Sequence, residues 1–231
     1  MPTTKELSFN IPSGDTVSAI LRQPVKSVGL FVLGHGSGST MRVPLMAELS
    51  EALFELNVAT LRFQYPYSGQ SEFVPFTDMP MDSDEVLIET IRAALDLANI
   101  ESGENPTYIG GHSVSGLMTT RADSDQPLPA DGIICLSYPR KGDPSRSKHL
   151  ALTSLPILII QGTEDTLGTP AEISEMVEML GEKASLKWIE GAGHVFQVKD
   201  RDIRTVTSNI ARHIHDHIIS AQYSQKYEKE P

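Results

Sequence analysis

The sequence contains a single cysteine, Cys135, so the chain cannot form an internal disulfide. Cys135 lies in the apolar run GIICLS, where we expect a small buried side chain and not a reactive thiol. Long apolar stretches are also missing: no run approaches the roughly 20 residues that span a bilayer. The segment MPTTKELSFN shows no basic region followed by an apolar stretch. We therefore expect neither export nor membrane attachment, and a reducing, cytoplasmic location.

Basic residues are scarce. Lysine and arginine total 19 against 30 aspartates and glutamates, which gives a formal net charge of -11. Such a chain repels phosphate backbones, so we do not expect nucleic acid as a ligand. The 231 residues, 39% of them hydrophobic, suffice for one well-packed core but are few for two. We expect one domain over residues 1–222 and a polar tail over 223–231.

The first strands are short and alternate in polarity. ELSFNI and TVSAILR are separated by PSGD, which is typical of a hairpin. These two stretches predict an antiparallel edge of a sheet.

Continuous apolar runs then alternate with helical patterns. Strands are predicted at VGLFVLG, VATLRF, TYIGG, GIICLSY, PILIIQG and SLKWIE, and helices near 44–57, 82–98, from 113, 170–180 and 202–222. Strands buried on both faces that alternate with helices predict a mostly parallel sheet covered on both sides, a three-layer α/β fold. The longer connections, Tyr65–Met81 and Pro139–Ser154, follow strand ends, and neither is long enough for a large lid.

The segment GGHSVSGLM nearly matches G-x-S-x-G, the strand-to-helix turn that presents a catalytic serine. Residues two before and two after the nucleophile must be small. Ser113 has Gly111 and Ser115 at these positions, whereas Ser115 would have Leu117. The spacing therefore predicts Ser113 as the nucleophile. Ser115 replaces the usual glycine, and its hydroxyl either tightens the turn or leaves a polar group near the site.

A serine nucleophile needs a base and an acid that orients the base. Asp165 follows the strand PILIIQG and His194 follows the next strand, in GAGHVF. Loops after parallel strands meet at one edge of the sheet, and the order Ser, Asp, His is that of the strand-turn-helix hydrolases. Glu164 is an alternative acid.

The alternative bases are His112 and His35. His112 adjoins the nucleophile and is expected to point away from it, and His35 comes too early in the chain for this order. Two backbone N–H groups should bind the oxyanion. We expect one from Val114, which follows the nucleophile, and the other from Ser37 or else Gly36, in the loop GHGSGST. This loop also suggests dinucleotide binding, but its G-x-G-x-G spacing is not G-x-G-x-x-G.

The residues that would contact substrate are less clearly marked. Candidates are aromatic rings and a cation near the predicted strand ends: Tyr65, Tyr67, Tyr138, Phe196 and Arg140. Arg140 or the neighbouring Lys141 could meet an acidic substrate group, or both could be surface charges. In RHIHDH, His213 and His217 lie one helical turn apart beside Asp216; a solvated helix face is the commoner explanation than a metal site. We expect no metal and no cofactor.

Five segments resemble the α/β-hydrolase superfamily: LGHGSGSTMRVPLMAELSEAL, VATLRFQYPYSG, GGHSVSGLM, QGTEDTLGTP and GAGHVF. The chain is most similar to compact dienelactone-hydrolase-like members, especially the group of testis-expressed and NSL-complex-subunit hydrolase-like domains. The resemblance covers all but the tail and implies Ser113, Asp165 and His194 as a catalytic triad.

Two functions follow from these observations. The first is a serine hydrolase that cleaves a small or medium carboxylic ester or thioester through an acyl-enzyme. The second is a scaffold or interaction module that kept the fold and lost turnover, since a fold alone does not fix function.

Overall fold

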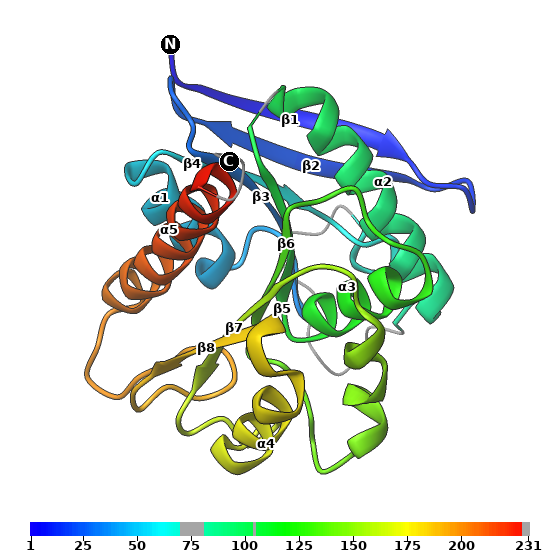
Figure 1. The fold of residues 1–231 in the computed structure, drawn as a ribbon. Coiled ribbons are helices and arrows are strands. Elements are labelled where there is room, and N and C mark those ends of the chain that lie inside the picture. Colours follow the sequence, from blue (N-terminus) through cyan, green and yellow to red (C-terminus); the bar gives the residue numbers. More distant parts are fainter. Residues whose placement is uncertain (70–80, 104, 228–231) are drawn as a thin grey trace.

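The computed structural model describes residues 1–69, 81–103 and 105–227. Its centre is an eight-stranded sheet in the order β1-β2-β4-β3-β5-β6-β7-β8 (Figure 1). The strands are β1 (Thr3–Asn10), β2 (Thr16–Gln23), β3 (Gly29–Gly34), β4 (Val58–Phe63), β5 (Thr107–His112), β6 (Gly132–Leu136), β7 (Ile157–Gly162) and β8 (Ala184–Ile189). β2 pairs antiparallel with β1 and with β4. The six strands from β3 to β8 all run parallel to one another.

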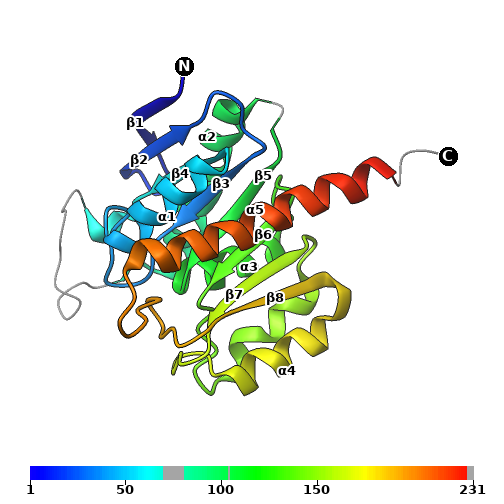
Figure 2. The same ribbon diagram turned by 90° about the vertical axis from the view of Figure 1, so that its left-hand side faces the viewer.

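Helices cover both faces of the sheet, as predicted. The helices are α1 (Pro44–Glu55), α2 (Asp84–Ser102), α3 (Val114–Asp125), α4 (Pro170–Leu180) and α5 (Ile203–Tyr227), with short 3-10 turns η1 (Pro66–Ser68), η2 (Pro144–Leu152) and η3 (Gly181–Lys183). α1 and α5 pack side by side on one face (Figure 2). α2, α3 and α4 pack on the other. The result is the predicted three-layer α/β fold.

The central strands are apolar on both sides because each side meets a layer of helices. In β3, Leu30 and Val32 face the layer of α2 and α3, while Phe31 and Leu33 face α1 and α5. Cys135 in β6 is fully buried on the first of these sides, and burial raises the pKa of its thiol. Cys135 is thus part of the core.

The largest differences from the predicted helix boundaries are at the ends of α2 and α5. α2 continues to Ser102 and α5 to Tyr227, whereas the pattern predicts ends near Ala98 and Gln222. α4 begins as predicted at Pro170. Its first turn is closed by a capping box in which the Thr169 hydroxyl accepts from the Glu172 N–H and the Glu172 carboxylate accepts from the Thr169 N–H.

The described connections hold no inserted domain. The predicted connection Pro139–Ser154 contains η2, and most of the connection Tyr65–Met81 lies outside the described residues. Among the helices described, none combines the length and the apolar content that a bilayer crossing requires.

Candidate active site

Ser113 occupies a sharp turn between β5 and α3. Its backbone lies at φ 53° and ψ -112°, a conformation that side-chain-bearing residues rarely adopt. Its N–H donates to the Leu136 carbonyl on β6 at 2.8 Å, which fixes the turn against the neighbouring strand. Gly111 precedes it with φ 140°, and a Cβ there would overlap the Gly34 carbonyl. The turn therefore depends on the close approach of β5 and β3.

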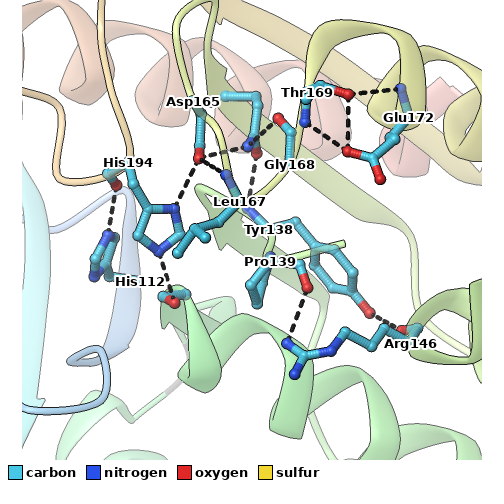
Figure 3. Close-up of polar contacts among 12 residues, drawn as sticks. His112, Tyr138, Pro139, Arg146, Asp165, Leu167, Gly168, Thr169, Glu172 and His194 are labelled. Carbon is cyan, nitrogen blue, oxygen red and sulfur yellow. Dashed lines mark hydrogen bonds and ion pairs between the residues drawn. The ribbon is translucent and has the colours of Figure 1, made fainter. Parts of the chain in front are cut away.

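The structure brings Ser113, His194 and Asp165 into one hydrogen-bonded row. The Ser113 Oγ lies 2.9 Å from His194 Nε2, and His194 Nδ1 lies 2.9 Å from Asp165 Oδ2 and 3.1 Å from Oδ1. Figure 3 shows the His194 ring extended from its loop toward Asp165. Because a carboxylate only accepts hydrogen bonds, Nδ1 carries the proton and Nε2 accepts from the serine hydroxyl. This arrangement suits transfer of the serine proton to His194.

Asp165 is 1% exposed, and neutral donors hold its carboxylate in place. Leu167 donates its N–H to Oδ1 at 2.8 Å, and the Gln161 side chain donates to Oδ2 at 2.7 Å. Gln161 also donates to the Gly168 carbonyl and accepts from the Tyr138 N–H at 2.7 Å. Sequence reasoning missed Gln161, although a polar residue inside the apolar run PILIIQG was a usable signal.

The second serine of the turn has a structural role. Ser115 is fully buried, and its hydroxyl donates to the His35 carbonyl at 2.6 Å while lying 2.8 Å from the Tyr65 hydroxyl. A Cβ on Gly34 would overlap Ser115, so the bare glycine on β3 makes room for this side chain. Ser115 thus ties α3 to the loop after β3, and leaves no unpaired polar group.

That loop is the expected source of oxyanion-binding N–H groups. Val114 is the first residue of α3, where N–H groups have no partner inside the helix. Gly36 packs against Ser113 and His112, and Ser37 lines the same cavities as Ser113. Val114 and the loop of Gly36 and Ser37 thus lie beside the serine.

His35 and His112 are buried, and neither contacts the Ser113 hydroxyl in the way His194 does. Burial lowers the pKa of each to about 4, so both rings are neutral near pH 7. His35 Nε2 accepts from the Tyr65 N–H at 3.3 Å. His112 Nε2 donates to the His194 carbonyl at 2.8 Å, as Figure 3 shows. The alternative bases therefore support the two loops that flank the nucleophile.

The alternative acid, Glu164, is exposed, and its neighbour Asp165 is the one that reaches His194. The Glu164 backbone N–H donates to the Ala192 carbonyl at 2.9 Å, which joins the acid loop to the histidine loop.

Two cavities meet at Ser113. The first, of about 380 Å³, is lined by His194 and by apolar side chains from the start of α1 and the residue before it, the histidine loop and the start of α5: Val43, Leu45, Met46, Val195 and Ile203. We call it the apolar cavity.

The second cavity, of about 440 Å³, lies on the side of α3 and η2. Beyond Val114, Leu117 and Met118 it is lined by five ionisable side chains: Arg121, Lys141, Arg146, Asp84 and Asp143. We call it the charged cavity. Ser37, Ser113 and Leu167 line both cavities, whereas His194 lines only the apolar one. Both volumes fall within the range of small-molecule sites.

The five predicted substrate residues line neither cavity in the described part of the chain. Tyr65 and Tyr138 are buried, with their hydroxyls on Ser115 and on the Arg146 carbonyl. Tyr67 donates to the Gly36 carbonyl. Phe196 is fully buried, and Arg140 is 5% exposed, with Glu175 3.9 Å away. These side chains lie near the strand ends. They pack beneath the loops of the site and support them.

The histidine cluster on the last helix and the glycine loop are the remaining sequence patterns. Among the described residues, no three or more His, Cys, Asp or Glu side chains are placed to hold a metal ion. His217 packs its ring edge on Tyr108, and His215, not His213, lies beside Asp216 at 3.2 Å. The glycine loop suggested for a dinucleotide lines the apolar cavity next to Ser113.

Solved structures share the fold over nearly the whole chain. A dienelactone hydrolase from Anabaena variabilis is 19% identical, with 93% of this chain and 96% of that chain covered and a TM-score of 0.72. A serine hydrolase without lid from Xanthomonas campestris is 19% identical over the same shares, with a TM-score of 0.71. An α/β serine hydrolase homologue from Coxiella burnetii is 18% identical, covers 94% and 96%, and has a TM-score of 0.69.

No curated protein sequence matches this chain significantly. The family model described as "Alpha/beta hydrolase domain" matches residues 27–221, which run from just before β3 into α5 and include the serine turn, the acid loop and the histidine loop. The chain belongs to the α/β-hydrolase domain family.

Proposed function

We propose that the protein is a serine hydrolase that cleaves a small or medium carboxylic ester or thioester. Ser113 attacks the carbonyl carbon, and its proton passes to His194 Nε2. Asp165 orients the ring and stabilises the imidazolium, while the Val114 N–H and an N–H of Ser37 or Gly36 bind the oxyanion. The alcohol or thiol then leaves with the proton from His194, and water releases the acyl group from Ser113.

The hydrogen-bonded row of Ser113, His194 and Asp165, at 2.9 Å for each link, is the observation that carries this proposal. Two features add support. The Ser113 backbone is held in a rare conformation, as expected of a nucleophile presented on a sharp turn. The cavities on either side of its hydroxyl have the size of a small-molecule site.

Labelling of the intact protein by a fluorophosphonate tests the nucleophile. We expect one adduct per chain by mass spectrometry, lost in Ser113→Ala and kept in Ser124→Ala, a matched serine at the other end of α3. An adduct that survives Ser113→Ala, or no adduct on folded protein, would contradict the proposal.

The scaffold hypothesis makes the opposite prediction. A non-catalytic module would show no ester turnover above that of His194→Ala when both are equally folded by circular dichroism. Turnover that disappears in His194→Ala rejects the scaffold. A location in the cytoplasm, which the buried, unpaired Cys135 supports, and membership of the testis-expressed and NSL-complex-subunit group are further proposals.

A further inference from the structure

We propose that the ester binds in one orientation, with an apolar alcohol part in the apolar cavity and an acyl part that ends in an acidic group in the charged cavity. The inference rests on the proposed function and adds the substrate class. It starts from the position of His194 relative to the two cavities.

Acyl transfer assigns a side to each half of the substrate. When the tetrahedral intermediate collapses, the bond from the carbonyl carbon to the alcohol oxygen breaks, and that oxygen takes the proton held on His194 Nε2. The alcohol must therefore leave on the side of the imidazole. His194 lines the apolar cavity and not the charged one, so the alcohol lies in the apolar cavity.

The apolar cavity suits an aliphatic or aromatic alcohol. Val43, Leu45 and Met46 line it from the start of α1 and the residue before it, and Val195 and Ile203 line it from the histidine loop and the start of α5. Apolar area removed from water here favours binding in proportion to its size. Its volume of about 380 Å³ accommodates a chain of several carbons.

The acyl group remains bonded to Ser113 and must extend the other way, past Val114. Leu117 and Met118 also line the charged cavity. Among the described residues that line this cavity, the charged side chains are three cations and two carboxylates, an excess of cations on a chain whose formal net charge is -11.

Two of these cations already have carboxylate partners. Arg121 lies 2.5 Å from Asp84, and Arg146 lies 3.8 Å from Asp143. For Lys141, no carboxylate of the described residues lies within ion-pair distance. Its backbone at φ 48° is fixed by an N–H donated to the Leu167 carbonyl at 2.6 Å, next to the acid loop. Lys141 is therefore the cation that an acidic acyl end would meet.

A pair of isomeric esters tests the orientation. Hexyl hydrogen succinate has an apolar alcohol and an acidic acyl group, and its isomer 4-(hexanoyloxy)butanoate has an apolar acyl group and an acidic alcohol. We expect kcat/KM at least tenfold higher for the succinate. Equal rates, or preference for the other isomer, would overturn the orientation.

Two variants test the two cavities separately. Lys141→Gln should lower the preference for hexyl hydrogen succinate over hexyl butanoate by about fivefold, the scale of one exposed ion pair. Lys187→Gln, an exposed lysine on β8, should leave this ratio unchanged. Ile203→Ala should lower the preference for hexyl over ethyl hydrogen succinate about tenfold and leave the charge preference intact. A Lys141→Gln protein with an unaltered ratio would overturn the acidic substrate class.

Hexyl acetate and fluorophosphonate labelling separate this inference from the proposed function. Labelled Ser113 and hexyl acetate turnover, together with a missing isomer preference, would overturn only the orientation. A folded protein that neither takes the label nor turns over any of these esters would overturn both.

Discussion

Asp123 and Asp165 are equally buried, each 1% exposed, and they lie at opposite ends of the parallel strands. Asp165 follows β7 at the carboxyl end of the sheet, beside Ser113. Asp123 is near the end of α3, where it bonds to the segments that lead into β6 and β7. Both carboxylates connect loops that are far apart in the sequence.

The difference between the two aspartates is in their donors. Asp123 accepts from the N–H groups of Leu128, Ser154 and Leu155 and from the Ser154 hydroxyl. Asp165 accepts from the imidazole N–H of His194 as well as from neutral groups. Burial and several hydrogen bonds are therefore no mark of catalysis. What distinguishes the end of the sheet at which we propose catalysis is a donor that can gain a proton and whose other nitrogen lies 2.9 Å from a serine hydroxyl.

The largest effect is expected at the catalytic end. Asp165→Asn should lower kcat for an activated ester by about 10⁴, because an amide donor opposite Nδ1 favours the wrong tautomer of His194. Steady-state kinetics measure this change. Asp123→Asn, assayed at a temperature where it is folded, is the matched control and should keep kcat within about twofold. A loss under tenfold in Asp165→Asn would remove the contrast between the two residues.

The next effect is on stability, at the other end of the sheet. Asp123→Ala should lower the free energy of unfolding by about 3 kcal/mol, since several buried N–H groups lose a charged acceptor. Urea denaturation followed by circular dichroism measures this. An unchanged denaturation midpoint would show that water replaces the carboxylate and that Asp123 is not structural.

A smaller effect is expected where a polar group supports the site without touching the reacting atoms. Ser115→Ala removes the hydroxyl between His35 and Tyr65 and should lower kcat about tenfold, since the loop of Gly36 and Ser37 loses a tether. The free energy of unfolding should fall by about 1–2 kcal/mol. Tyr65→Phe keeps the hydrogen bond from the Ser115 hydroxyl to the His35 carbonyl and should retain most of kcat. If Ser115→Ala and Tyr65→Phe lower kcat by the same factor, the hydrogen bond from Ser115 to the His35 carbonyl does not account for the loss.

A further effect on stability is a dependence on pH that we expect from His35 and His112. Their folded-state pKa values of about 4 lie below the ordinary value of 6.5, so the unfolded chain binds more protons between these limits. Stability should therefore fall as pH drops from 6.5 toward 4, with each ring contributing at most about 1.4 kcal/mol per pH unit. Urea midpoints at pH 7 and pH 5 should differ less in His112→Gln than in wild type. His215→Gln is the control, since this ring on α5 is partly exposed. If His215→Gln reduced the difference between the two urea midpoints as much as His112→Gln does, burial of His112 would not be the cause of the pH dependence.

The sequence was most informative where one constraint determined the answer. The order of strands and helices predicted the three-layer fold, because buried parallel strands have an unmistakable apolar pattern. The same logic predicted that Ser113, Asp165 and His194 would come from loops at one edge, and the structure brings these side chains together. The size of Leu117 was enough to choose Ser113 over Ser115.

The surroundings of the site could not be predicted in the same way. Tyr65 and Tyr138 follow strand ends, yet both rings turn inward and pack, a choice that depends on neighbours remote in sequence. His112 was predicted to point away from the nucleophile, but its ring lines the apolar cavity together with Ser113, 5.1 Å from the His194 ring, and its bond to the His194 carbonyl joins residues 82 positions apart. The apolar cavity likewise combines the loop before α1 with the start of α5. Such contacts require the tertiary structure.

Gly34 and Ser115 occupy one shared volume where β3 passes α3. Their substitutions should therefore be epistatic. Gly34→Ala alone should be poorly tolerated, because the new methyl group overlaps the Ser115 side chain, whereas Ser115→Gly removes the two atoms nearest to that methyl group and leaves the edge of Phe63 at 3.0 Å. A library that varies one position at a time would therefore score Gly34 as invariant, although alanine at position 34 should be tolerated once position 115 is glycine.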